Sequence, residues 1–205
     1  MNPVKIVCLG DSLTGPVPGE WYQDKFLKWP DLLGLMATAR LGGGRAVVFN
    51  RGHAGGNSAH ALERLPSQVL AEHPDLVAVL IGGNDFGHDA DPISTSEKLR
   101  QNLTAIVRAV KEAGSKILLL QYFQPRAENM AGVWTHLNSG NPVIAEVAAV
   151  EEVPLLPLEP SFQKAADTYG ISTLTDPVDG VHLRPFGETV VAEAVFHKFT
   201  ELGWL

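Results

Sequence analysis

The 205-residue sequence has a single cysteine, no long hydrophobic run and no cluster of basic residues. One cysteine, Cys8, excludes an intramolecular disulfide and the zinc sites built from several thiolates. The longest apolar stretches, such as 76–81, are far shorter than the ~18 residues that cross a bilayer, so we expect no membrane span. Lys and Arg number 16 against 23 Asp and Glu, which argues against a nucleic-acid partner.

The composition is that of an ordinary globular protein, with 45% hydrophobic and 19% charged residues. A chain of this length fits one domain over residues 1–205. The N-terminal segment MNPVKIVCLG has too short an apolar run for a signal peptide. We therefore expect a cytoplasmic protein, although a mature secreted form without its leader would look the same. Nothing in the sequence indicates the oligomeric state.

Short apolar runs alternate with segments of helical periodicity along the whole chain. The expected strands are 4–9, 46–49, 76–81, 116–123 and 153–158. The expected helices are 30–41, 57–73 with a kink or restart at Pro66, 94–114 opened by a capping box of Ser94 and Glu97, 143–150, 161–169 and 185–203. This alternation predicts an α/β protein with three α/β/α layers and a mostly parallel five-stranded sheet.

Polar and glycine-rich segments follow three of the expected strands, and a fourth lies near the C-terminus. They read GDSLT at 10–14, NRGHAGG at 50–56, GGND at 82–85 and DGVHL at 179–183. Ligands of parallel α/β sheets bind outside the carboxyl ends of the strands, so chemistry is expected there. Taken singly, each segment also has a structural interpretation: Ser12 as a helix cap, Gly55 and Asn84 as turn residues, and His182 as a core histidine.

Together these residues meet the needs of acyl transfer. A serine hydroxyl such as that of Ser12 is a weak nucleophile until a base removes its proton. His182 is a suitable base, and Asp179, three residues earlier, can hold its imidazole in one tautomer. The N–H of Ser12, an N–H of the glycine loop and the side-chain amide of Asn84 can then stabilise the oxyanion.

The four segments resemble the sequence blocks of the SGNH hydrolases, also called GDSL esterases and lipases, over 10–187. The resemblance implies Ser12 as nucleophile, Asp179 and His182 as its triad partners, and Gly55 and Asn84 as oxyanion donors beside Ser12. It also implies a flavodoxin-like fold and hydrolysis of carboxylic esters without a cofactor or metal. The adjacent Gly56 leaves the position of the backbone donor open by one residue.

Several other interpretations remain open. An acyltransferase would use the same triad, and a non-catalytic binding module could keep the fold alone. Asp85, His88, Asp89 and Asp91 could suit a hard cation, but a solvated acidic loop explains them better. Ser58 lies two residues after Gly56, as in a hydrolase elbow, yet the final glycine of that motif is missing. We therefore interpret Ser58 as a helix cap, a position that Asn57 could also take.

The substrate is expected to be a small-molecule ester with a small or medium acyl group, including O-acetyl groups on carbohydrates. Trp21, Tyr22 and Trp134 lie in two loops near the expected site and could line its pocket. The spacing of Trp21, Tyr22, Phe26 and Trp29 also fits the buried face of a helix, which is the competing interpretation.

Overall fold

A computed structural model of the chain describes residues 2–16, 26–87, 90–126 and 135–205. Its strands are β1 (Val4–Gly10), β2 (Ala46–Gly52), β3 (Leu76–Leu80), β4 (Lys116–Gln121) and β5 (Leu155–Pro157). They form one sheet in the order β2-β1-β3-β4-β5, and every neighbouring pair is parallel. The predicted five-stranded α/β fold is therefore confirmed.

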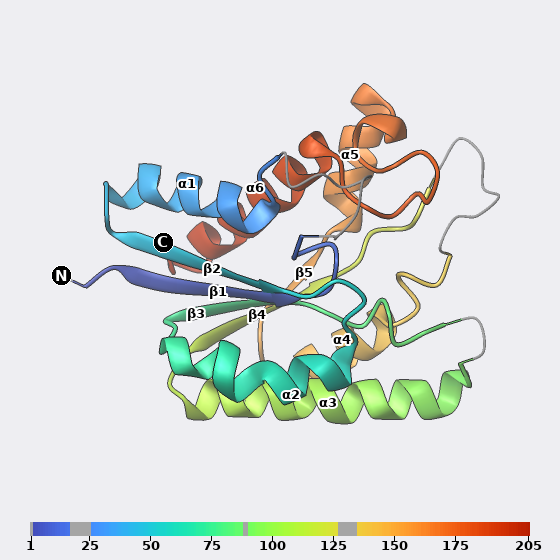
Figure 1. Cartoon of the computed structure of the whole chain (residues 1–205), viewed down its shortest axis with the longest axis horizontal. Helices are drawn as coiled ribbons and strands as arrows, with labels where there is room; N and C mark the ends of the chain where they lie inside the picture. The colour runs from blue at the N-terminus through green and yellow to red at the C-terminus, as the bar shows by residue number, and fades with distance from the viewer. Residues whose placement is uncertain (1, 17–25, 88–89, 127–134) are drawn as a thin grey trace.

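Helices cover both faces of this sheet (Figure 1). One layer contains α1 (Trp29–Leu41), α5 (Glu159–Tyr169) and α6 (Pro185–Glu201). The opposite layer contains α2 (Ser58–Gln68), α3 (Pro92–Glu112) and α4 (Asn141–Val150). Two short 3₁₀ segments, η1 (Leu70–Glu72) and η2 (Ile171–Thr173), follow α2 and α5. The arrangement has the three α/β/α layers that the alternation predicts.

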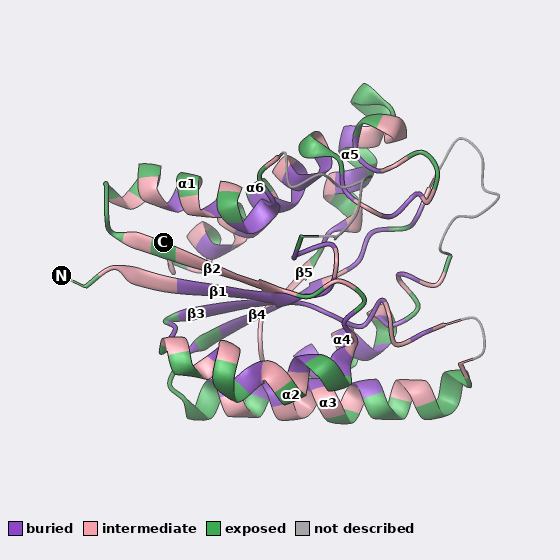
Figure 2. Cartoon of the chain, viewed as in Figure 1, coloured by how far each residue is buried: buried purple, intermediate pink, exposed green. Residues whose placement is uncertain are grey.

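The core lies between the sheet and its two helical layers (Figure 2). All five residues of β3, LVAVL, are buried, because a central parallel strand is covered on both faces. Cys8 in β1 is also fully buried, and burial raises the pKa of its thiol. Cys8 is thus a packing residue, as expected.

The boundaries of α2 and α3 show how the observed helices differ from the predicted ones. Asn57 caps α2, accepting a hydrogen bond from the N–H of His60, and the helix continues through Pro66 to Gln68 before η1. The helix α3 begins at Pro92, where the Asp91 carboxylate accepts from the N–H of Ser94. The predicted capping box of Ser94 and Glu97 is wrong, because an Asp followed by Pro already provides both a cap and a helical first turn.

The ends of β1, β2 and β3 lie level in the sheet. Gly10 at the end of β1 pairs with Gly52 of β2 and with Leu80 of β3. The chain therefore leaves the three strands at one edge, and β1 and β3 are adjacent although β2 separates them in sequence. The connection after β1 leads to β2 on one side of β1, and the connection after β2 leads to β3 on the other side. Such a reversal of strand order marks the usual ligand position of doubly wound sheets.

Candidate active site

Ser12 lies in a tight turn directly after β1. The N–H groups of Thr14 and Gly15 donate to the carbonyl oxygen of Asp11, at 3.1 and 2.8 Å. The turn packs closely on the end of β2, where a Cβ atom on Gly52 would lie 2.0 Å from the nitrogen of Gly15. Glycine at these positions thus allows the two backbones to touch and leaves Ser12 half-buried at the sheet edge.

Asp179 and His182 lie on the loop between η2 and α6. An antiparallel bridge between Thr175 and Leu183 closes this loop, and Gly180 takes a positive φ of 69° within it. The Oδ1 atom of Asp179 accepts from the backbone N–H groups of Val181 and His182, at 2.8 and 3.0 Å. The side chain of Asp179 thereby folds the turn that carries His182.

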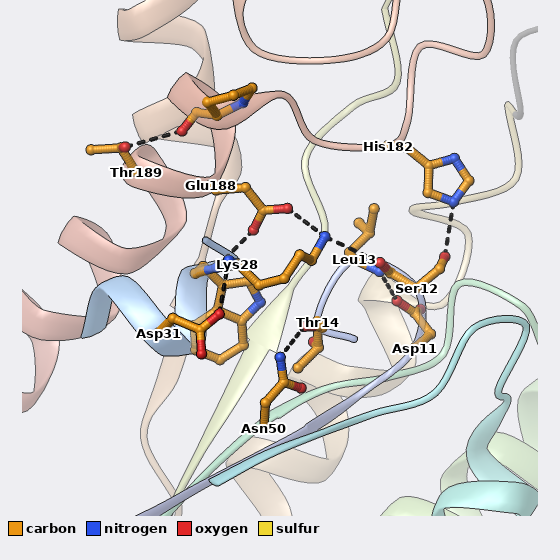
Figure 3. Close-up of polar contacts among 12 residues, drawn as sticks. Asp11, Ser12, Leu13, Thr14, Lys28, Asp31, Asn50, His182, Glu188 and Thr189 are labelled. Atoms are coloured by element: carbon orange, nitrogen blue, oxygen red, sulfur yellow. Dashed lines mark hydrogen bonds and ion pairs between the residues drawn. The ribbon is translucent and has the colours of Figure 1, made fainter. Parts of the chain in front are cut away.

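The structure brings Ser12, His182 and Asp179 into one hydrogen-bonded chain. Nδ1 of His182 lies 2.7 Å from Oδ2 of Asp179. Nε2 of the same ring lies 3.0 Å from Oγ of Ser12, the contact drawn in Figure 3. An ionised carboxylate only accepts hydrogen bonds, so Nδ1 carries the proton and Nε2 is left to accept from the serine. Burial by itself raises the pKa of Asp179, but hydrogen bonds from His182 and Val181 outweigh it and hold the pKa below its usual value.

The side-chain amide of Asn84, just after β3, ties the glycine loop to this edge. Its Nδ2 donates to the carbonyl oxygen of Gly56 at 2.9 Å, which leaves the second amide hydrogen for another acceptor. The N–H of Gly56 donates to the carbonyl oxygen of His53, whereas the N–H groups of Gly55 and Ser12 have no hydrogen-bond partner among the described residues. This difference favours Gly55 over Gly56 as a backbone N–H that could donate to an oxyanion.

A small cavity lies beside Ser12. Its volume is about 60 Å³, and its lining consists of Asp11, Ser12, Leu13, Asn84, Leu137, Val181 and His182. Leu137 is 4% exposed and approaches the backbone of the segment that follows β3, since a Cβ on Gly83 would lie 2.8 Å from its Cδ1. Sequence reasoning missed Leu137, because a single leucine after an irregular segment carries no local signal of a pocket.

Asp11, the residue before Ser12, is a buried carboxyl group. Its Oδ2 accepts from the hydroxyl of Tyr122 at 2.6 Å, and its Oδ1 accepts from the N–H of Leu13 at 2.9 Å. Burial raises the pKa of Asp11 to about 6, although these hydrogen bonds act to lower it. Tyr122 follows β4, so the carboxyl ends of β1 and β4 are linked through this contact.

The carboxylate of Asp85 forms hydrogen bonds within the protein instead of facing solvent as part of an acidic loop. Its carboxylate accepts from the N–H of Ser58 at 2.9 Å and from the Ser58 hydroxyl, which in turn accepts from the side chain of Asn102 at 2.9 Å. Ser58 is therefore a buried link between α2 and α3, and its interpretation as the helix cap is wrong because Asn57 has that position.

No group of three or more potential metal-ligating side chains occurs within the described residues. Of the acidic cluster considered as a cation site, Asp91 caps α3, and His88 and Asp89 lie outside the described residues. Trp21, Tyr22 and Trp134, the candidate pocket residues, also lie outside them. Trp29 is fully buried at the start of α1, which supports the core interpretation for this one aromatic residue.

A buried ion pair close to Ser12 has no counterpart in the sequence-based expectations. Lys28, just before α1, pairs with Glu188 in the first turn of α6. The two residues are 160 positions apart, so no motif or spacing could have linked them.

Comparisons with known proteins identify relatives of this chain. Residues 8–190 match the model of the GDSL-like lipase/acylhydrolase family. An arylesterase from Vibrio mimicus is 33% identical over 59% of this chain and 56% of its own length, so the chain matches only about half of that relative. No helix in the described part of the chain is long and apolar enough to cross a membrane.

Solved structures show the same architecture over almost the whole chain. An α/β hydrolase enzyme from the metagenome of Lake Arreo, Spain, is 22% identical with a TM-score of 0.76, covering 100% of this chain and 97% of its own. A lipase/acylhydrolase from Enterococcus faecalis is 25% identical with a TM-score of 0.73, covering 97% and 96%. The family model, matched over most of the chain, confirms the resemblance seen in the four sequence blocks: this protein belongs to the GDSL-like lipase/acylhydrolase family.

Proposed function

We propose that this protein is a serine esterase that hydrolyses carboxylic esters through an acyl-enzyme on Ser12. The observation that carries the proposal is the hydrogen-bonded chain from Ser12 through His182 to Asp179, with separations of 3.0 and 2.7 Å. Both distances lie within the reach that a general base needs for its nucleophile and its orienting carboxylate. Membership of an acylhydrolase family supports the same chemistry.

In the proposed acylation step, the Oγ of Ser12 attacks the ester carbonyl carbon while Nε2 of His182 takes the hydroxyl proton. Asp179 holds the imidazole and stabilises its charge. The N–H groups of Ser12 and Gly55 and the amide of Asn84 donate to the tetrahedral oxyanion. Collapse of the intermediate breaks the carbon–oxygen bond of the ester, and the leaving alcohol receives the proton from His182.

In the deacylation step, water takes the place of the alcohol. His182 removes one proton from the water as its oxygen attacks the acyl carbon, and the carboxylic acid leaves when Ser12 regains its proton. An alcohol or sugar attacking in place of water would make the same protein an acyltransferase. Both outcomes use the same residues, so product analysis with and without an alcohol acceptor distinguishes them.

The cavity beside Ser12 favours a short acyl group. Its volume of about 60 Å³ is small, since about 10–15 Å³ of such space already suffices for one water molecule. An acetyl group fits this space, whereas an octanoyl chain needs room outside the lining formed by Leu13, Leu137 and Val181. We therefore propose acetyl esters, including O-acetyl groups on carbohydrates, as the preferred class.

Hydrolysis of p-nitrophenyl acetate, butyrate and octanoate by the wild type and by Ser12→Ala tests this function. We expect Ser12→Ala to lose about 10⁴-fold or more in kcat with an unchanged melting temperature, and wild-type kcat/KM to fall with chain length. Ser67→Ala, an exposed serine of α2, is the control and should be fully active. A Ser12→Ala variant with wild-type activity would overturn the proposal.

A further inference from the structure

We propose that Lys28 and Glu188 act as a buried positioning pair for the nucleophile turn, fixing Ser12 relative to the element that carries its base. The inference rests on the proposed function. It adds two residues that touch neither the substrate nor the reacting atoms.

Lys28 reaches the nucleophile through its ammonium group. The Nζ atom lies 3.5 Å from the carbonyl oxygen of Ser12 and forms an ion pair with Oε1 of Glu188 (Figure 3). The side chains of Lys28 and Glu188 are 11% and 0% exposed. The other carboxylate oxygen of Glu188 accepts from the N–H of Trp29 at 2.8 Å. Glu188 therefore holds both the ammonium group and the first turn of α1.

The peptide bond between Ser12 and Leu13 is held from both sides. Lys28 approaches its carbonyl oxygen at 3.5 Å, and Oδ1 of Asp11 accepts from its N–H at 2.9 Å. This peptide follows the Cα of Ser12 directly, so its orientation sets the direction of the Ser12 side chain. The other carboxylate oxygen of Asp11 accepts from the hydroxyl of Tyr122. Asp11 and Lys28, the two residues that contact this peptide, therefore each have a buried partner, Tyr122 and Glu188 respectively.

The pair also connects the two halves of the triad. Ser12 follows β1 near the N-terminus, whereas Glu188 lies in the first turn of α6, only six residues after His182. A shift of α6 against the Ser12 turn would change the distance between Nε2 of His182 and Oγ of Ser12. Lys28 spans this boundary, since it contacts the turn on one side and α6 on the other. A displacement of about 1 Å at such a contact costs about 10²-fold in rate.

Stability alone is a weak explanation for the pair. Taking two charges out of water costs several kcal/mol per ion, and well-packed apolar residues often replace a buried pair without loss. Burial raises the pKa of Glu188 to about 7, with the Asp31 carboxylate acting in the same direction and Lys28 opposing both. Glu188 is thus mainly ionised only above this pH, and the enzyme should be assayed there.

A double variant tests the proposal without leaving either member of the pair as a charge that has lost its partner. Lys28→Met keeps the stem of the side chain, and Glu188→Gln keeps an oxygen for the N–H of Trp29. At about pH 8 we expect kcat for p-nitrophenyl acetate to fall about tenfold or more with KM within about twofold of wild type. The rate at which a fluorophosphonate labels Ser12 should fall by the same factor, because that reaction needs only the positioned triad.

The matched control removes a second ion pair with a buried carboxylate. Arg108 of α3 pairs with Glu151 at the end of α4, on the opposite helical layer. Arg108→Met/Glu151→Gln should leave both kcat and the labelling rate near wild type. Lys28→Arg keeps the charge and a donor for the Ser12 carbonyl, and should retain kcat within about threefold.

The outcomes separate this inference from the proposed function. A folded Lys28→Met/Glu188→Gln variant with wild-type kcat and labelling rate overturns the positioning role, while Ser12→Ala still tests the esterase mechanism independently. If the double variant does not fold, Glu188→Gln alone decides. A lower kcat at normal KM supports the role, and an unchanged kcat overturns it. Activity that persists in Ser12→Ala would remove the proposed function and the inference with it.

Discussion

The Nε2 atom of His182 lies 3.0 Å from the Oγ atom of Ser12, although 170 positions separate the two residues in the chain. Ser12 is presented by the turn after β1, and His182 by the loop that precedes α6. This separation is within the reach that a general base needs for its nucleophile. The reactivity of this pair should therefore depend on the proton arrangement of the imidazole, which Asp179 controls.

Asp179→Asn should lower kcat about 10⁴-fold with little change in the melting temperature. The new amide can donate to Nδ1 of His182, which moves the imidazole proton to Nε2 and removes the acceptor for Ser12. Asp176→Asn, in the same loop, is the control, because its Oδ1 accepts from the N–H of Val178 and an amide oxygen can do the same. A fall of less than about tenfold in Asp179→Asn would contradict the assigned role.

Asn84→Ala should lower kcat by about 10²–10³, corresponding to the 2.7–4 kcal/mol lost with one oxyanion donor. KM should change little, because this donor acts mainly on the tetrahedral intermediate. The variant also loses the hydrogen bond to the Gly56 carbonyl, so thermal unfolding is measured in parallel. A variant with normal kcat and only a lower melting temperature would show that Asn84 serves the glycine loop alone.

The stability of the protein should fall as the pH rises from about 5 to about 7. Burial raises the pKa of Glu188 from 4.5 to about 7, so the folded state keeps a proton that the unfolded chain releases. This contribution is complete below pH 4.5 and is lost as the pH rises through the folded value, by about 3 kcal/mol at most. Asp11, raised from 3.8 to about 6, acts in the same direction.

Urea unfolding of the wild type and of Glu188→Gln at about pH 5 and about pH 7.5 measures this effect. The glutamine variant should show a smaller fall in the free energy of unfolding over this range, since it has no proton to lose at that position. Equal falls in the two proteins would show that Glu188 titrates near its usual pKa in the folded state.

Asp85→Ala should destabilise the protein by about 1–3 kcal/mol, because the buried N–H and hydroxyl of Ser58 would both lose their acceptor. Asp91→Ala removes an exposed cap from α3 and should destabilise the protein less than Asp85→Ala, which makes it a matched control. Chemical denaturation measures both values. A cost for Asp85→Ala no larger than that of Asp91→Ala would contradict a structural role of the link between Asp85 and Ser58.

Local patterns in the sequence predicted most of the secondary structure. The five strands were found because runs such as 76–80 are continuously apolar, and the polar blocks at 10–14 and 82–85 were found because they interrupt that pattern directly afterwards. Local signals also misled in two places. Ser94 with Glu97 resembles a capping box, but the Asp91–Pro92 pair begins the helix earlier. Pro66 predicts a kink or restart, but the helix α2 continues through it to Gln68.

The sequence by itself determined the fold class and the residue types of the site, since hydrophobic periodicity and the four blocks are properties of short segments. Only the tertiary structure decided which of these groups touch. Tyr122 meets Asp11 across 111 positions and Lys28 meets Glu188 across 160. No short-range pattern records such pairs, because they arise when parallel strands and their crossovers bring separate segments to one edge of the sheet.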